Sequence, residues 1–319
     1  MKILITGGAG FIGSYLSNKL SNYNEIHVVD NSIRGDYSRL NDGIKIFNID
    51  LTKMDQLKKL DNNYDFIFHL AAINGTDNFY NNHHKVFEVG VKSILNIYDH
   101  FKNQKSKIIT ASSAEVYQTP NIIPTDEKIQ CIIPDITNHR YSYGGSKIFS
   151  ELLVFNYGID YFKSSIIFRP HNIYGPNMGY KHVIPQLIEK IKRAISKKNH
   201  FIQLIGDGSE TRAFCYIDDL INGLEILIKD GVDKNVYHIG NDYEISIYDL
   251  LQKIIKIMGV NIDIVKGENT HEGGTKRRCP DISKIKKLGY NPKYDLDQGL
   301  NLTIQWYLDN DNNYSNKLI

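Results

Sequence analysis

A glycine-rich turn directly after the first apolar run constrains the fold of this chain more than any other feature. Residues 7–13 read Gly-Gly-Ala-Gly-Phe-Ile-Gly, which satisfies the pattern GxGxxG at Gly8, Gly10 and Gly13. Residues 2–6 have the apolar, β-branched character of a strand, and the residues after the turn have helical periodicity. In such a strand–turn–helix unit, free N–H groups at the helix N-terminus bind phosphate. We therefore expect the turn to hold the diphosphate of a dinucleotide, through Gly7, Gly10, Phe11, Ile12 and Gly13.

An acidic residue at the end of the second predicted strand indicates which dinucleotide is bound. Asp30 lies seventeen residues beyond Gly13, where a carboxylate can accept hydrogen bonds from the adenosine ribose. The same carboxylate repels a 2′-phosphate, so the sequence favours NAD over NADP, and Arg34 nearby weakens this preference slightly. Asp50 either contacts the adenine amine or is the N-cap of the next helix. The other residues predicted at the cofactor site are Asn31, Leu51, Leu70, Ala71, Ala72 and Pro170.

The first 175 residues alternate between short β-branched segments and longer segments with helical periodicity. We predict strands at 2–6, 25–29, 44–48, 66–70, 107–111 and 164–168, and helices at 10–20, 53–58, 80–101 and 141–157. This alternation predicts an α/β fold, a doubly wound parallel sheet of the Rossmann type over residues 1–175.

The strict alternation fades beyond residue 175. Residues 176–308 predict a smaller α+β domain, from which later segments return to the first domain, and residues 309–319 predict a polar tail. A helix predicted at 183–197 has one apolar stripe, made of Ile184, Leu187, Ile188, Ile191 and Ile195.

The composition argues against several classes of protein. Thirty-eight basic and thirty-six acidic side chains leave a net charge of +2, which argues against a nucleic-acid partner. Cys131, Cys215 and Cys279 are far apart and have no ligand-like spacing to any histidine, so we expect no disulfide framework, no metal site and a reducing, cytoplasmic environment. No apolar run reaches the roughly 20 residues of a membrane helix, and we expect neither a secretory signal nor a membrane partner.

A tyrosine and a lysine one helical turn apart indicate acid–base chemistry. Tyr143 and Lys147 have i, i+4 spacing at the start of the helix that follows the fifth predicted strand, so both side chains share one face. Free tyrosine titrates near pH 10 and is a poor base at neutral pH. An ammonium one turn away favours the phenolate, so we expect Lys147 to lower the pKa of Tyr143.

Together these motifs resemble the extended short-chain dehydrogenases/reductases, and more narrowly their NAD-dependent nucleotide-sugar epimerase/dehydratase group. The resemblance covers essentially the whole chain. It rests on residues 7–13, Asp30, residues 70–72, Ser112, Ser113, Tyr143, Lys147, residues 169–176, residues 206–219 and residues 277–281. It implies a tightly held NAD, a nucleotide-diphosphate sugar as substrate, binding of that substrate by residues 176–308, and a homodimer formed through the helices predicted at 80–101 and 141–157.

The resemblance also implies individual roles. Tyr143 takes the proton from the sugar C4 hydroxyl while the C4 hydride passes to NAD, Lys147 holds the nicotinamide ribose, and Ser113 hydrogen-bonds the reacting oxygen. Asn172 contacts the sugar diphosphate, and Arg212 and Arg278 neutralise it, since arginine binds phosphate bidentately. His171 either faces the sugar or is a buried histidine with satisfied hydrogen bonds.

The step after C4 oxidation depends on residues 113–115. Sugar 4,6-dehydratases of the group have an Asp-Glu pair there, whereas this chain has Ala114 before Glu115. Nucleotide-glucuronate decarboxylases also have the glutamate, but after a serine or threonine. Simple 4-epimerases usually have a small hydroxyl residue in place of Glu115. Many relatives also have an asparagine where this chain has Gly90.

These departures leave three hypotheses. The first is an epimerase that acts through transient C4 oxidation, because the acid of the dehydratases is missing. The second is a dehydratase or decarboxylase that uses Glu115 at C5 or at the sugar carboxylate. The third, a dinucleotide-sensing module without catalysis, is disfavoured because Tyr143 and Lys147 are both present.

Overall fold

The computed structural model describes residues 1–102, 104–268 and 275–310. The predicted tail therefore lies outside the described residues from position 311 onward. Among the described residues, no helix has the length and the apolar character needed to cross a membrane.

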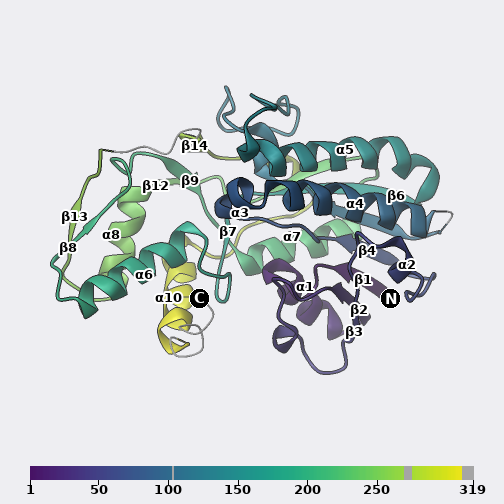
Figure 1. Cartoon of the computed structure of the whole chain (residues 1–319), viewed down its shortest axis with the longest axis horizontal. Coiled ribbons are helices and arrows are strands. Elements are labelled where there is room, and N and C mark those ends of the chain that lie inside the picture. The colour runs from purple at the N-terminus through teal and green to yellow at the C-terminus, as the bar shows by residue number, and fades with distance from the viewer. Residues whose placement is uncertain (103, 269–274, 311–319) are drawn as a thin grey trace.

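A seven-stranded parallel sheet forms the larger lobe, on the right in Figure 1. Its strand order is β11-β6-β5-β4-β1-β2-β3. The strands are β1 (Lys2–Thr6), β2 (Glu25–Asp30), β3 (Lys45–Asn48), β4 (Phe66–His69), β5 (Lys107–Ala111), β6 (Ser164–Pro170) and β11 (Val236–Ile239). Most residues of the central strands are buried, as expected for a parallel sheet covered on both faces. The predicted doubly wound α/β fold is confirmed.

Helices cover both faces of this sheet (Figure 1). On one face, α4 (His83–Phe101) and α5 (Ser142–Tyr161) pack on Leu4, Ile67 and Ile108 of the strands. On the other face, α1 (Phe11–Ser21) and α7 (Ile217–Asp230) belong to the core that contains Ile3 and Ile5. Neighbouring β1 residues point to opposite faces, which explains why an almost wholly apolar strand is needed at this position.

The smaller lobe, on the left in Figure 1, is built from the later part of the chain. Its helices are α6 (Val183–Ser196), α8 (Ile247–Ile257) and α10 (Leu296–Asp309). Strands β12 (Glu244–Ser246), β9 (Thr211–Ala213) and β14 (Arg277–Arg278) form one small sheet, and β13 (Asp263–Val265) pairs with β8 (Phe201–Gln203). Two-residue strands β7 (Ile173–Tyr174) and β10 (Cys215–Tyr216) pair with each other.

The chain returns to the first sheet late in its course. Strand β11 pairs in parallel with β6, so the larger lobe contains residues beyond 175. The short elements that remain are α2 (Met54–Leu57), α3 (Thr76–Asn81), α9 (Ser283–Lys286) and the 3₁₀ turns Tyr37–Arg39, Ala114–Tyr117 and His139–Tyr141.

Two predictions about helices were wrong in detail. The helix predicted at 80–101 is two helices, because Asn82 at φ −131° and ψ 29° leaves helical geometry between α3 and α4. The stripe on α6 includes Ile184, Leu187, Ile188 and Ile191, but Ile195 is 47% exposed. Ala194 is buried instead, and Ile195 lies at the end of α6, one residue before its last residue Ser196.

Candidate active site

A cavity of about 620 Å³ lies at the carboxyl ends of the parallel strands. In doubly wound sheets this edge is where ligands bind, since the strand-to-helix loops converge there. The cavity is lined by every residue predicted for the cofactor site: Gly7, Gly10, Phe11, Ile12, Gly13, Asp30, Asn31, Asp50, Leu51, Leu70, Ala71, Ala72, Tyr143, Lys147 and Pro170. Thus the structure brings together residues from six strand ends and two long helices around one space.

The glycine turn has the geometry of a diphosphate cradle. Gly7 has φ +68°, and a Cβ there would lie 2.9 Å from the Ala71 backbone. A Cβ on Gly13 would lie 2.1 Å from the Gly7 carbonyl oxygen, so only glycine allows helix α1 to start this close to β1. Helix α1 has Gly10 as its N-cap and no side-chain cap, which leaves its first N–H groups available to an anion. These features fit the diphosphate of NAD.

The adenosine end of the cavity is formed by Asp30 and Asp50. Asp30 accepts backbone hydrogen bonds from Ala9 at 3.1 Å and Ser32 at 2.9 Å, which fix its carboxylate at the cavity wall. Asp50 accepts from the backbone N–H and the hydroxyl of Thr52, at 2.9 Å and 2.8 Å. The interpretation of Asp50 as an N-cap was wrong, because the residue at that position of α2 is Lys53.

Tyr143 and Lys147 lie at the opposite end of the cavity, on the first turns of α5. Both side chains are buried, and the Lys147 ammonium is 5.7 Å from the centre of the Tyr143 ring. Lys147 Nζ donates to the Ala111 carbonyl at 2.8 Å, which ties α5 to the end of β5. Phe79 stacks on the Tyr143 ring at a centroid distance of 5.1 Å and an angle of 13°, so the phenol is held between aromatic and polar walls.

Burial controls the pKa values of this pair. It raises the pKa of Tyr143 to about 12, against the lowering effects of a hydrogen bond with Ser113 and of the Arg34 charge. It also lowers the pKa of Lys147 to about 8. The expected lowering of the Tyr143 pKa by Lys147 is therefore wrong for the protein alone, because burial dominates the pKa of Tyr143 and Lys147 is not among the groups that shift it.

Glu115 extends the site beyond Tyr143. Ser113 caps the 3₁₀ turn Ala114–Tyr117, with its hydroxyl accepting from the Glu115 N–H at 3.1 Å. The Glu115 carboxylate accepts from Arg278 Nη1 at 2.8 Å and lies 3.6 Å from Arg140 Nη2. Burial by itself raises the pKa of Glu115, but the charges of Arg278, Arg140 and Arg212 together hold it below the ordinary value. At neutral pH the residue is a carboxylate among guanidinium groups.

Arg140 is a residue of this site that sequence reasoning missed. It lies in the 3₁₀ turn His139–Tyr141, three residues before Tyr143, and its side chain is 11% exposed. Its closeness in sequence to Tyr143 is the only signal that could have suggested it. Arg212 lies outside the cavity lining, and its guanidinium donates to the Thr211 carbonyl at 2.7 Å.

The predicted substrate residues His171 and Asn172 differ in their placement. Asn172 lines the cavity and has φ +42°, with its amide donating to the Ala213 carbonyl at 3.1 Å. His171 does not line the cavity, and it is 1% exposed. Neither of its ring nitrogens has a hydrogen-bond partner among the described residues, so it is buried but not satisfied.

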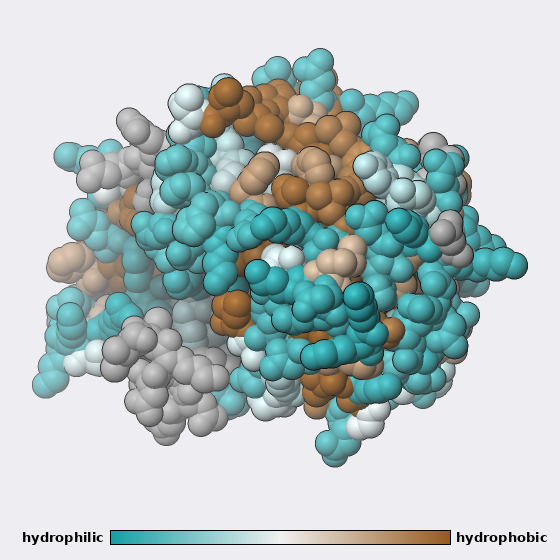
Figure 2. Space-filling model, turned by 45° about the vertical axis from the view of Figure 1, so that its right-hand side comes forward, coloured by the Kyte–Doolittle hydropathy of each residue, from teal (hydrophilic) through white to brown (hydrophobic). Residues whose placement is uncertain are grey.

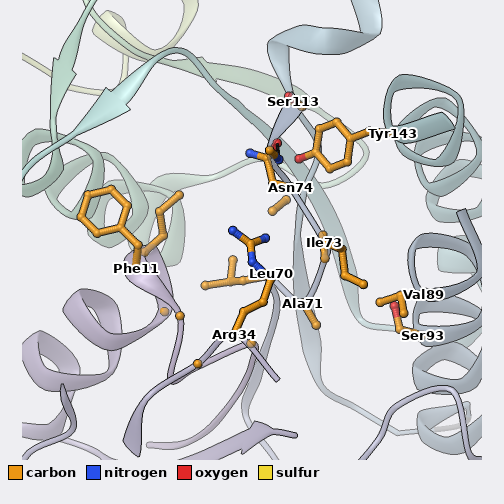
Figure 3. A pocket seen from close by; sticks show the side chains of 18 of the residues that line it. Phe11, Arg34, Leu70, Ala71, Ile73, Asn74, Val89, Ser93, Ser113 and Tyr143 are labelled. Atoms are coloured by element: carbon orange, nitrogen blue, oxygen red, sulfur yellow. Dashed lines mark hydrogen bonds between the residues drawn. The ribbon is translucent and has the colours of Figure 1, made fainter. Parts of the chain in front are cut away.

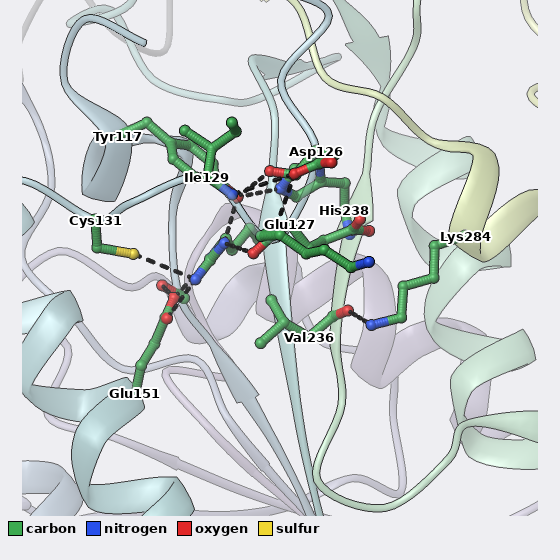
Figure 4. Close-up of polar contacts among 12 residues, drawn as sticks. Tyr117, Asp126, Glu127, Ile129, Cys131, Glu151, Val236, His238 and Lys284 are labelled. Atoms are coloured by element: carbon green, nitrogen blue, oxygen red, sulfur yellow. Dashed lines mark hydrogen bonds and ion pairs between the residues drawn. The ribbon is translucent and has the colours of Figure 1, made fainter. Parts of the chain in front are cut away.

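A buried polar network includes Tyr117, Glu151 and His238 (Figure 4). Glu151, two turns beyond Tyr143 on α5, accepts from Arg169 Nη2 at 2.6 Å and from the Ser112 hydroxyl at 2.5 Å. Arg169 in turn donates to the Tyr117 hydroxyl, which lies 2.6 Å from Nε2 of His238. The network joins α5, Ser112 directly after β5 and Tyr117 at the end of the 3₁₀ turn, and so restrains the segment that contains Ser113 relative to α5.

The doubly wound sheet, the glycine cradle and the buried Tyr-Lys pair define a dinucleotide-dependent enzyme. The model of the NAD dependent epimerase/dehydratase family matches residues 3–240. The chain belongs to this family, whose structurally characterised members bind NAD, and NAD is its cofactor.

Comparison with individual proteins narrows the class of reaction. UDP-N-acetyl-alpha-D-glucosaminuronate decarboxylase of Bacillus cytotoxicus is 31% identical over 98% of this chain and 99% of its own length. UDP-glucuronic acid decarboxylase 3 of Arabidopsis thaliana is 33% identical over 95% of this chain and 87% of its own. The UDP-glucuronic acid 4-epimerase of Bacillus cereus, solved with NAD and a fluorinated UDP-glucuronic acid, has a TM-score of 0.85 and 26% identity, over 97% of this chain and 99% of its own. The chain is thus an enzyme of the nucleotide-sugar epimerase, dehydratase and decarboxylase group.

Proposed function

We propose that this protein is an NAD-dependent decarboxylase of a nucleotide-activated hexuronic acid. The observation that carries the proposal is the ion-pair cluster around Glu115. One carboxylate lies beside Arg278 and Arg140, and the charge of Arg212 also acts on it. Three guanidinium groups around one carboxylate leave excess positive charge, which a second carboxylate on the sugar can neutralise.

The first step belongs to Tyr143. Bound NAD supplies the acceptor for the C4 hydride of the sugar. Tyr143, in its phenolate form, removes the proton from the C4 hydroxyl, and Ser113 hydrogen-bonds the same oxygen. Lys147 holds the nicotinamide ribose. Because burial raises the pKa of Tyr143 to about 12, the phenolate depends on positive charge from Lys147 and from the oxidised nicotinamide when the cofactor is bound.

Loss of carbon dioxide follows from the 4-ketone. In a 4-keto hexuronate the ketone is β to the C6 carboxylate, so the C5–C6 bond can break with its electron pair passing to the ketone oxygen. A proton must then reach C5. A sugar carboxylate bound beside Glu115 adds a second negative charge, which raises the pKa of Glu115 and allows it to carry this proton. Tyr143 can then give its proton back to the C4 oxygen, while the hydride that NAD would have accepted would return to C4, which leaves a nucleotide pentose.

The relatives support this reaction over the epimerase that the sequence alone favoured. Two of them, over 30% identical across nearly the whole chain, are uronate decarboxylases by name. A second candidate is C4 epimerisation of the same acidic sugar, which the structural likeness to the Bacillus cereus enzyme favours. Ala114 occupies the position at which nucleotide-glucuronate decarboxylases have a serine or threonine. Its methyl side chain is 3% exposed and cannot form a hydrogen bond with the substrate.

A substrate panel tests the proposed substrate class. The purified protein is incubated with equal concentrations of UDP-glucuronate, UDP-N-acetylglucosaminuronate and UDP-glucose, and products are followed by NMR. Turnover of an acidic sugar alone, with release of carbon dioxide, supports the proposal. Turnover of UDP-glucose alone, or loss of water in place of carbon dioxide, contradicts it.

A further inference from the structure

A cationic side chain in the middle of the cofactor cavity is not explained by the motifs above. Arg34 follows β2 and lines the cavity together with residues of α5 and of the turns that follow β1 and β4. Figure 3 shows its guanidinium extending past Leu70 into the space between Phe11 and Asn74. The loop packs tightly on Asp30 beside Arg34, because a Cβ on Gly35 would lie 2.7 Å from the Asp30 carboxylate.

The position of Arg34 along the cavity is defined by its electrostatic neighbours. Its charge interacts with Tyr143 at the nicotinamide end and with Asp30 at the adenosine end. It also acts on His182 at the start of α6, across the cavity from the sheet. A charge that interacts with residues at both ends of the cavity lies near its middle. In an extended NAD molecule the diphosphate is the middle part.

Arg34 has no protein partner in the described part of the chain. No acceptor there forms a hydrogen bond or ion pair with its guanidinium, and burial lowers its pKa. Arg39, which also lines the cavity, differs in this respect, because its Nη2 donates to Asn177 at 2.9 Å. The Arg34 side chain is exposed at the cavity wall, and a guanidinium there without a protein acceptor can form charge-assisted hydrogen bonds with an anion placed beside it.

We propose that Arg34 binds the diphosphate of NAD on the side opposite the glycine turn. The turn offers backbone N–H groups from Phe11 and the residues after it, and Arg34 adds a full positive charge. In this role Arg34 does not bind a 2′-phosphate. The sequence, in which Arg34 lies close to Asp30, had suggested that it slightly weakens the preference for NAD over NADP. The proposal concerns the cofactor only and does not depend on which sugar reaction the enzyme catalyses.

Binding of cofactor fragments to protein freed of nucleotide tests this role. Isothermal titration of wild type, Arg34→Met and Arg34→Lys uses adenosine, ADP, ADP-ribose and 2′,5′-ADP. Because Arg34→Met removes one charge-assisted contact, we expect it to weaken the binding of ADP and of ADP-ribose by about 10- to 100-fold. Adenosine affinity should change less than about twofold, and Arg34→Lys should lie between, since lysine keeps the charge without the bidentate geometry.

The controls separate this role from a structural one. Lys19→Met removes an exposed cation from the last turn of α1, outside the cavity, and should leave all four affinities unchanged. Arg34→Met protein purified directly should also retain less NAD per chain than wild type, measured after acid release. Unchanged ADP affinity, an equal loss for adenosine, or a loss confined to 2′,5′-ADP would each overturn the proposal.

Discussion

The carboxylate of Glu115 and the guanidinium of Arg278 meet at 2.8 Å across 163 positions of sequence. Arg278 also donates to the Thr275 hydroxyl at 3.0 Å, and Thr275 donates to the Gln118 carbonyl at 2.8 Å. The C-terminal segment is thus attached to the turn that contains Glu115. This attachment gives the larger lobe, which holds the cofactor, an arginine from the last third of the chain.

Replacing Glu115 by glutamine tests proton transfer at C5. Glu115→Gln keeps the size and a hydrogen-bond acceptor but cannot exchange a proton. We expect turnover to fall by about 10²- to 10⁴-fold, with reduced nicotinamide accumulating because oxidation at C4 still proceeds. Absorbance of the reduced cofactor and product NMR measure this. Glu225→Gln, on α7 outside the cavity, is the matched control. If Glu115→Gln no longer oxidised the sugar at C4, Glu115 would act before decarboxylation, which would contradict its proposed role at C5.

Replacing Arg140 tests recognition of the sugar carboxylate. Arg140→Met removes one of the guanidinium groups beside Glu115 while keeping side-chain bulk. One lost charge-assisted contact predicts that kcat/KM for the uronate falls by about 10- to 100-fold. The control variant Arg193→Met, on the exposed side of α6, should leave kcat/KM for the uronate unchanged. An unchanged kcat/KM in Arg140→Met would place the carboxylate elsewhere.

Lys147 makes stability depend on pH in a defined window. Its pKa is lowered to about 8 in the folded protein from an ordinary value of 10.5, so below pH 8 the folded state holds a buried charge at a cost. Between pH 8 and 10.5 the unfolded chain binds the proton and the folded one does not, so stability rises with pH. We expect this rise to be on the order of 3 kcal/mol.

The variant Lys147→Met should lack this rise. Urea unfolding of nucleotide-free protein at pH 7.5 and pH 10 compares the two proteins by their free energies of unfolding. Lys147→Met should be the more stable at pH 7.5, by an amount that shrinks at pH 10. A constant difference between the proteins at both pH values would mean that Lys147 is not desolvated.

The exposed apolar surface of α4 and α5 predicts a dimer. Phe87, Leu152, Phe155 and Tyr157 are between 37% and 59% exposed on these two helices. Figure 2 shows an apolar area along the upper part of the molecule, where α5 lies in Figure 1. We expect Leu152→Glu to shift sedimentation toward a monomer, whereas Leu302→Glu on α10, also exposed, should not. A wild-type monomer at micromolar concentration would contradict this.

Local motifs predicted the cofactor end of the site well. The glycine turn, Asp30 and the Tyr143–Lys147 pair each depend on neighbours within a few residues or on strand order, and all of them line one cavity. Strand β5 was predicted with its observed bounds, since its apolar run is short and clearly delimited.

Features that depend on distant segments could not be predicted in this way. Arg140 reaches Glu115 only because the 3₁₀ turn before α5 folds over the end of β5. The pKa of Tyr143 depends on burial by Phe79 and the surrounding wall, which sequence spacing does not reveal. The place of Arg34 in the cavity wall depends on how the loop after β2 packs, for example Gly35 on Asp30, and no motif specifies that packing.

Fate of the sugar C6 atom tests the central claim most directly. UDP-glucuronate labelled with ¹³C at C6 is incubated with the protein, and ¹³C NMR follows the label. The proposed decarboxylase predicts that the label moves entirely to carbon dioxide and bicarbonate while a UDP-pentose forms, with no net accumulation of reduced nicotinamide. A product that keeps the label on a hexuronate inverted at C4 would contradict decarboxylation and identify an epimerase.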